Sequence, residues 1–230
     1  MERKLAEEIK QPKYFEGEIG ISHKEGTRDL LPLLPFIISG GKNTERYYFQ
    51  HINTIKGTSF NIEPKYFGKE SNYTKEFPKR ISEILKNHND AKIFCVFDWD
   101  TIYDDVTNQT NHNKFVDGIR EYINKGKVVL CPSMPSIEYW FLLHFEDDKS
   151  LFLNCESLKE PLKCMESYFD KDKYGKSVIS KLKEKEYIKN KDWVEKLCAD
   201  GKLEMAIERA EKKTDSMNQS YSYVYKIFKS

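Results

Sequence analysis

The sequence lacks several features by which common classes of protein are recognised. Its apolar runs are far shorter than the ~20 residues of a membrane-spanning helix, and residues 1–10 are charged throughout, unlike a secretory signal. The five cysteines form no CxxC pair and show no zinc-binding spacing, so we expect reduced thiols, with Cys95 and Cys131 buried. A Walker-type phosphate loop is missing, because Gly40-Gly41-Lys42 lacks its spacing. These absences predict a cytoplasmic protein without a membrane anchor.

An excess of charge of either sign is also missing. The 230 residues contain 38 Lys and Arg against 37 Asp and Glu, a net charge of +1. Global charge therefore neither favours nor excludes a nucleic-acid partner. The length suits one domain with a helical appendage. We predict an N-terminal arm over residues 1–30, an α/β core over residues 31–150, and a helical extension packed on that core over residues 151–230.

Short apolar runs alternate with amphipathic segments through the first two thirds of the chain. The runs typical of buried strands occupy residues 36–39, 60–64, 93–97 and 128–131. Helical patterns occupy residues 45–50, 77–87, 115–124 and 137–145, with Thr44 as an N-cap, Ser136 or a neighbour as another, and a polar loop at 104–113. After residue 150 strand patterns fade, and the clearest helix covers 199–213. This alternation predicts a mostly parallel sheet flanked by helices.

Two acids follow the strongest of these apolar runs. The run from Ile93 to Phe97 leads into Asp98 and Asp100, whose i, i+2 spacing points both side chains the same way from an extended chain. Open α/β sheets bind their ligands at the carboxyl ends of the strands, and a hard cation such as Mg²⁺ reconciles two adjacent carboxylates. The alternative is that these acids only cap the next turn or helix, as Asp residues at strand ends often do.

Glu45 and Glu138 are predicted to lie at the same edge of the sheet, because each follows a strand. Glu45 comes one glycine turn after the first strand, and Glu138 lies in a helix made otherwise of large apolar residues and His144. A buried charge is costly unless it is paired or bound to a cation. Glu138 is therefore either functional or half of a structural pair with an Arg or Lys. His144 is either a satisfied core residue or a ligand.

Several segments of the chain carry a resemblance to a known family. Three of them are the glycine turn with Thr44-Glu45 and the following aromatic residues, the Val-Phe-Asp-x-Asp at residues 96–100, and the block from Ser133 to Phe145. The others are Tyr174-Gly175-Lys176 and the segment from Asn218 to Lys226. From about residue 34 to the end, the chain resembles the RloB-like family, and the block from Pro135 to Phe145 is the most specific part.

The resemblance implies a Toprim-like fold, as found in proteins of bacterial restriction loci and abortive-infection systems. In Toprim domains a Glu after the first strand and an Asp-x-Asp after a later strand hold Mg²⁺ (or Mn²⁺) for phosphodiester chemistry. Matched residue by residue, this implies Glu45, Asp98 and Asp100 as metal ligands, with Glu138 as a further catalytic candidate. The first motif departs from the pattern Glu-Gly-x-x-Thr-Glu of related proteins, since its first Glu is Gly40 here.

Two functional hypotheses result. The first is a Mg²⁺-dependent nuclease or phosphotransfer effector of antiviral defence that acts on DNA or RNA. In it, Lys176, with Lys181 and Lys183 nearby, is either a phosphate contact or part of a solvated Lys-rich helix face. The second is a catalytically weak or inert Toprim-fold sensor or partner subunit that acts with an associated ATPase. This second hypothesis follows from Gly40. In related proteins the first Glu of the motif stands at this position, and it is the one commonly assigned to metal binding or acid/base catalysis.

Overall fold

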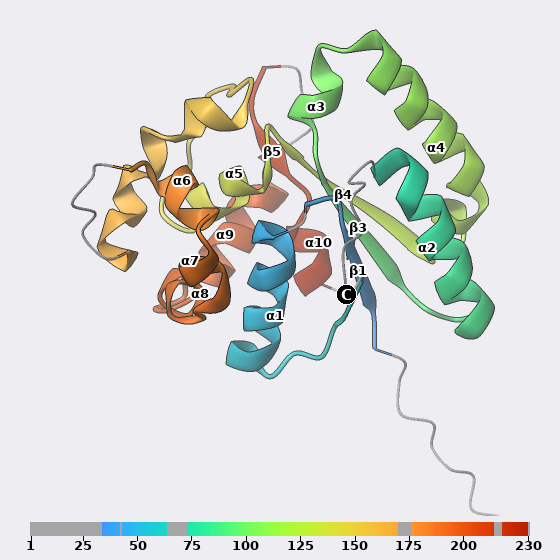
Figure 1. The fold of residues 1–230 in the computed structure, drawn as a ribbon, viewed down its shortest axis with the longest axis horizontal. Coiled ribbons are helices and arrows are strands. Elements are labelled where there is room, and N and C mark those ends of the chain that lie inside the picture. Colours follow the sequence, from blue (N-terminus) through green and yellow to red (C-terminus); the bar gives the residue numbers. More distant parts are fainter. Residues whose placement is uncertain (1–33, 42, 64–72, 170–175, 214–217, 230) are drawn as a thin grey trace, which may run out of the picture. The chain divides into compact units, whose positions relative to one another are not determined.

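The computed structural model describes residues 34–41, 43–63, 73–169, 176–213 and 218–229. Within them a five-stranded sheet has the order β2-β1-β3-β4-β5 (Figure 1). The strands are β1 (Phe36–Ser39), β2 (Asn61–Glu63), β3 (Ile93–Asp98), β4 (Val128–Met134) and β5 (Tyr221–Ser222). The first four pair in parallel, and β5 is antiparallel to β4. The predicted α/β fold with a mostly parallel sheet is confirmed.

Helices connect the strands and form most of the chain after β4 (Figure 1). Those between the parallel strands are α1 (Thr44–Lys56), α2 (Tyr73–Asn87), α3 (Asp100–Tyr103) and α4 (Val106–Asn124). After β4 come α5 (Ile137–Leu142), η1 (Cys155–Leu158), η2 (Pro161–Tyr168), α6 (Val178–Leu182), α7 (Lys185–Lys189), α8 (Asp192–Leu197), α9 (Lys202–Glu211) and α10 (Tyr225–Phe228). In the described part of the chain, no helix combines the length and apolar character that crossing a membrane requires.

β3 is buried on both faces, as its continuous apolar run predicts. Because side chains alternate along a strand, Ile93, Cys95 and Phe97 join the core beneath α2 and α4, whereas Phe94 and Val96 join the core beneath α1 and α5. Figure 1 shows α2 and α4 on one side of the sheet and α1 on the other. The last residues of β3 therefore have two different environments, one on each face.

The helices that follow residue 150 complete the core beneath α1 and α5. Buried side chains of η2, α6, α8, α9 and α10 belong to the same cluster as those of α1 and α5. Within this cluster the indole Nε1 of Trp140 donates a 2.9 Å hydrogen bond to the hydroxyl of Tyr48. This contact ties α5 to α1 through a satisfied buried polar pair. It fixes the two helices whose first turns carry Glu138 and Glu45.

Several local predictions are wrong in detail. Helix α1 already includes Thr44, so the N-cap position falls on Asn43. The predicted loop at 104–113 is largely helical, because the side chain of Asp105 accepts a 2.8 Å hydrogen bond from the Asn108 amide and starts α4. Helix α5 ends at Leu142, three residues before the predicted end.

The end of the chain differs from the prediction in one further respect. The segment after residue 150 contributes a strand, β5, where no strand was predicted, since two residues are too few to form a periodic pattern. The predicted arm at residues 1–30 and the Tyr174-Gly175 pair lie outside the described residues. The division of the chain into an arm, a core and an extension stays a prediction.

Candidate functional site

The four predicted acids lie at one edge of the sheet. The strands β1, β3 and β4 are parallel neighbours, so their carboxyl ends meet on the same side. Glu45 is in the first turn of α1 after β1, Asp98 ends β3, Asp100 begins α3, and Glu138 is in the first turn of α5 after β4. Three adjacent strand ends thus supply four carboxylates, where open α/β folds place their ligands.

Glu45 is almost fully enclosed, with 4% of its surface exposed. Burial raises the pKa of its carboxyl from 4.5 to about 7, and the nearby carboxylate of Glu138 raises the pKa further. The backbone amides of Glu45 itself and Gly41 hydrogen-bond to the carboxylate and oppose this shift, as does the charge of Lys183. With a pKa of about 7, the Glu45 carboxyl is partly protonated near neutral pH.

Gly41 provides the space that the Glu45 carboxylate occupies. A Cβ atom built on Gly41 would overlap the carboxylate of Glu45, whereas one built on Gly40 would lie 3.5 Å from the Cβ of Phe97 and 3.6 Å from the Cβ of Tyr73. Gly41 has no left-handed φ, so the requirement for glycine there is steric. The close approach of Glu45 to the turn thus depends on the missing side chain at position 41.

Asp98 is the acid on which the other three act together. Burial raises its pKa well above the ordinary value, and the charges of Glu45, Glu138 and Asp100 raise that pKa further. Its Oδ1 atom accepts a 2.9 Å hydrogen bond from the backbone N–H of Ile137, the first residue of α5. Asp98 therefore caps α5 in place of the Ser136 side chain, which makes no capping hydrogen bond. The capping role and the ligand role are compatible, because Oδ2 remains for a ligand.

Asp100 lies beside this group and is half-buried. Burial is the main cause that raises its pKa, and Glu138 raises it further. The backbone amides of Cys155 and Thr101 hydrogen-bond to the carboxylate, and these bonds together with the charge of Lys183 act in the opposite direction. Asp100 thus links the end of β3 to the segment that begins η1.

Glu138 is 4% exposed, in a helix whose six residues are all buried. Within the described ranges, no Lys or Arg forms a salt bridge with Glu138. The structural pair left open by the sequence is therefore not seen there. Its charge acts instead on the pKa values of Glu45, Asp98 and Asp100.

Two further residues act on the acids. Lys183, which the sequence singled out only as a neighbour of Lys176, follows α6, and its charge lowers the pKa values of Glu45 and Asp100. Cys155 opens η1, and burial followed by the charge of Glu138 raises the pKa of its thiol to about 12, so the thiol stays protonated. Cys155 was missed as a site residue, because the segment that brings it to the sheet edge carries no recognisable motif.

Lys176 and His144 have other surroundings. The Nζ atom of Lys176 lies 2.7 Å from Oε1 of Glu184 in an exposed salt bridge. The Nδ1 atom of His144 lies 2.9 Å from the carbonyl oxygen of Trp140, and burial lowers the pKa of this imidazole to about 3. His144 is therefore a neutral core residue, and none of the four acids is among the causes of its shift.

The chemistry of the four acids fits a hard divalent cation, because each offers carboxylate oxygens. Among the residues that the structure describes, no three His, Cys, Asp or Glu side chains form a ready-made metal cage. Mg²⁺ usually keeps several waters and is held by one or two carboxylates together with substrate phosphates. The expectation that Asp98 and Asp100 point the same way from an extended chain is not met, because β3 ends at Asp98, Trp99 has a helical conformation and Asp100 begins α3. The assignment of Asp98, Asp100 and Glu45 as metal ligands stays a prediction.

Comparison with known proteins gives one positive result. The family model described as RloB-like protein matches residues 36–229. No curated protein and no solved structure matches the chain. Because the matched residues form most of the chain, the protein belongs to the RloB-like family.

The raised pKa of Glu45 predicts a specific pH dependence of stability. In EDTA, the melting temperature of Glu45→Gln relative to wild type should rise by several degrees between pH 5 and pH 8. The reason is that unfolded Glu ionises near pH 4.5 whereas folded Glu45 does so near pH 7, so ionisation destabilises the fold over this interval. Calorimetry measures the difference, and the exposed Glu146→Gln is the control. If the melting temperatures of the variant and the wild type differ by the same amount at pH 5 and at pH 8, this result contradicts the burial of Glu45.

The contact between Gly41 and Glu45 predicts unequal effects of two neighbouring substitutions. Ligands that bind only the folded state raise its melting temperature. Gly41→Ala should remove most of the stabilisation that 10 mM Mg²⁺ or Mn²⁺ gives, a concentration chosen as roughly saturating, because the added Cβ displaces the Glu45 carboxylate. Gly40→Ala is the matched control and should keep the stabilisation by metal, since the added Cβ would make only ordinary van der Waals contacts. Equal metal responses in the two variants would exclude Glu45 from the metal site.

Proposed function

We propose that this RloB-like protein is a Mg²⁺-dependent nuclease or phosphotransfer effector of an antiviral, abortive-infection system with a Toprim-like core. The observation that carries the proposal is the convergence of Glu45, Asp98, Asp100 and Glu138 at the carboxyl edge of a parallel sheet. Buried acids that repel one another destabilise the fold, and groups with such perturbed pKa values cluster at functional sites. Family membership supports the biological setting.

In this proposal Asp98 and Asp100 are the metal ligands, and Glu45 is the third. Asp98 keeps Oδ2 for the cation while Oδ1 holds the start of α5, so the ligand is fixed before any substrate arrives. Bound Mg²⁺ supplies the positive charge that stabilises a phosphodiester group during displacement. The residues of the chain would supply the position of that charge.

Glu45 and Lys183 have the remaining roles. A carboxyl with a pKa of about 7 is suited to proton transfer at neutral pH, so Glu45 can take a proton from an attacking water or return one to a leaving oxygen. Lys183 is exposed and electrostatically close to Glu45 and Asp100, so its ammonium group can hold a substrate phosphate at the edge of the acid cluster. We prefer it to Lys176, whose ammonium group is paired with Glu184.

A second candidate function follows from two specific observations. The acids form no closed cage among the described residues, and residue 40 is Gly where the resemblance to the family implies a Glu. A Toprim-fold sensor or partner subunit with little catalysis, acting with an associated ATPase, would keep the fold and the acid cluster for structural reasons. In that case purified protein would cleave nothing alone.

The central prediction concerns Asp98→Asn. With Mg²⁺ or Mn²⁺, wild-type protein should cleave DNA or RNA, and the variant should lose about 100-fold or more in rate, because a metal ligand contributes several kcal/mol. Asparagine keeps an oxygen for the Ile137 amide, so the fold should survive. The exposed Asp104→Asn is the matched control and should retain activity. No cleavage of single- or double-stranded DNA or RNA with either metal would favour the sensor function instead.

The assignment of the phosphate contact is tested by binding in EDTA. Lys183→Gln should weaken the binding of nucleic acid uniformly across sequences and reduce the salt dependence by about one counterion. Lys176→Gln and the exposed Lys185→Gln remove the same charge from nearby positions and should have little effect. Fluorescence anisotropy at several salt concentrations measures all three. An effect of Lys176→Gln that exceeds that of Lys183→Gln would reverse the assignment.

A further inference from the structure

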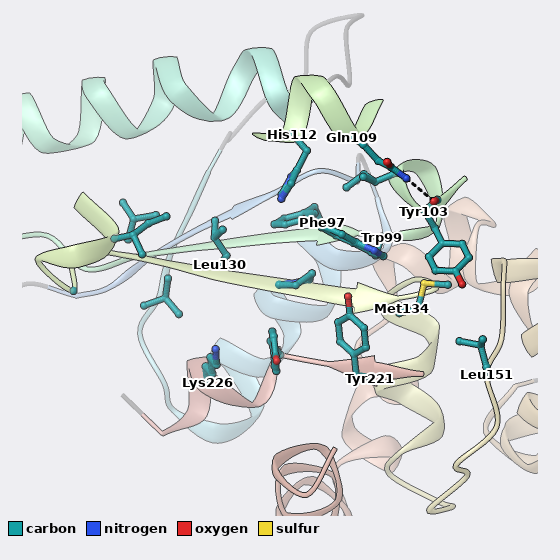
Figure 2. Close-up of a pocket in the computed structure, with 17 residues that line it drawn as sticks. Phe97, Trp99, Tyr103, Gln109, His112, Leu130, Met134, Leu151, Tyr221 and Lys226 are labelled. Atoms are coloured by element: carbon teal, nitrogen blue, oxygen red, sulfur yellow. Dashed lines mark hydrogen bonds between the residues drawn. The ribbon is translucent and has the colours of Figure 1, made fainter. Parts of the chain in front are cut away.

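A cavity lies close to the acid cluster, on the other side of the end of β3. It has a volume of about 710 Å³ and lies between the ends of β3 and α3, the helix α4, the edge of β4 and the C-terminal segment (Figure 2). Neither the acids nor Lys183 line it. Its size is within the range of pockets for small ligands and single nucleotides.

The cavity opens where β4 is left without a partner. β5 pairs only with Ser133 and Met134, so among the described residues the earlier part of β4 is an edge strand. Val129 and Leu130 lie in this part and are half-buried, and they point to opposite faces of the sheet. Both line the cavity, which therefore extends around the edge of β4. An apolar lining next to an unpaired edge favours a ligand that brings a flat apolar surface.

Aromatic side chains form the walls. Trp99 is half-exposed and contacts His112 edge to face, with ring centroids 4.8 Å apart and an interplanar angle of 87°. On the C-terminal segment, the ring centroids of Tyr221 and Tyr223 are 5.5 Å apart. In Figure 2, Trp99 and Tyr221 approach the cavity from opposite sides. Tyr221 is buried, with 7% of its surface exposed, whereas Trp99 and Tyr223 are half-buried, so the accessible parts of the Trp99 and Tyr223 rings are the surfaces that can stack on a planar ligand.

A few polar groups are placed among these rings. The Nζ atom of Lys226 lies 4.0 Å from the ring centroid of Tyr223, and Lys226 is the single Lys or Arg, with no Asp or Glu, among the described lining residues. The amide Nε2 of Gln109 donates a 2.7 Å hydrogen bond to the Tyr103 carbonyl, which leaves the amide oxygen as an acceptor. One cation without a counter-carboxylate favours an anionic ligand.

The position of Trp99 connects the cavity to the acids. Trp99 lies between Asp98 and Asp100 in the chain, and its backbone N–H donates to the carbonyl oxygens of Ser133 and Pro135 at 2.9 and 3.0 Å. These hydrogen bonds hold the indole on the cavity side, next to carboxylates that belong to the acid cluster. A ligand in the cavity and a phosphate at the acids are therefore separated by the end of one strand.

We propose that the cavity binds an unstacked base of a single-stranded nucleic acid, with the base between the aromatic walls and a neighbouring phosphate at Lys226. The proposal rests on the proposed function and restricts its substrate, since a base inside a duplex cannot enter a pocket of this kind. Stacking on aromatic side chains tolerates any base and is a common means of holding single strands. The C-terminal segment 218–226, which the resemblance singled out, thereby acquires a role.

Tryptophan fluorescence tests this proposal without metal and therefore without cleavage. Trp140 and Trp193 are 0% and 3% exposed, so a ligand in the cavity should quench Trp99 selectively. The full chain is titrated in EDTA with a single-stranded oligonucleotide of about 12 nucleotides, a length typical of single-strand binding sites. We expect quenching that disappears in Trp99→Phe, while the anisotropy of a labelled oligonucleotide shows that this variant still binds.

Two further variants measure the contributions of the walls and of the cation. Tyr223→Leu should weaken binding by about fivefold or more, the effect of losing one stacking partner. Lys226→Gln should weaken it as well, whereas Lys229→Gln, which removes the same charge from the end of α10 beyond the cavity, should not. Equal affinities of Lys226→Gln and Lys229→Gln, or quenching that persists in Trp99→Phe, would overturn the proposal.

The form of the ligand is decided by two additional titrations. A duplex of the same sequence should quench weakly, and equal quenching by the duplex would overturn the proposal. Equal affinity for a mononucleotide would also overturn it, in favour of a free nucleotide as the ligand. Quenching without any cleavage in Mg²⁺ would support the cavity while contradicting the nuclease function, and cleavage by a protein whose Trp99 is not quenched would contradict the cavity alone.

Discussion

Mutual repulsion among buried carboxylates is the constraint around which this fold is arranged. Burial is the main cause that raises the pKa of Asp98, and the charges of Asp100 and of Glu45 and Glu138, both 4% exposed, raise it further. Three adjacent parallel strands bring these acids together, so the repulsion cannot be relieved without disturbing the sheet. Backbone amides at Gly41 and Ile137 offset part of it. Protons or a cation must offset the rest, which is why pH and divalent metals are the variables to which this edge should respond.

The parts of the site that follow strands could be predicted from the sequence. Asp98 comes directly after an apolar run, Glu45 and Glu138 each follow one after a short turn, and the rule that parallel strands end at a common edge places them together. Asp98 caps a helix, although this helix is α5 and not the next helix in the chain, and ligation by Asp98 stays a prediction. The backbone amide that Asp98 caps is 39 residues away, so no local pattern could have identified it.

The placement of residues from irregular or late segments could not be predicted. Lys183 and Cys155 reach the acids only through the packing of the helices after residue 150, and β5 is too short to produce a strand pattern. The cavity has the same origin, since Trp99 and Gln109 lie far in sequence from Tyr223, which completes its lining. Its existence depends on β5 covering only the last two residues of β4. A tertiary feature of this kind leaves no periodic signal in any one segment.

The glycine at position 40 weakens the case for catalysis less than the sequence alone implies. The Gly40 amide donates a 2.8 Å hydrogen bond to the Val96 carbonyl, so this residue still belongs to the pairing of β1 with β3. A Cβ there begins beside Phe97 and Tyr73, on the face covered by α2 and α4, whereas Glu45 approaches the chain at Gly41. The side chain of a Glu at position 40 would thus leave the backbone on the face covered by α2 and α4. This face is opposite to the one that packs beneath α1. The absence of this Glu leaves the contacts of Glu45 unchanged, and the residue on which those contacts depend is Gly41.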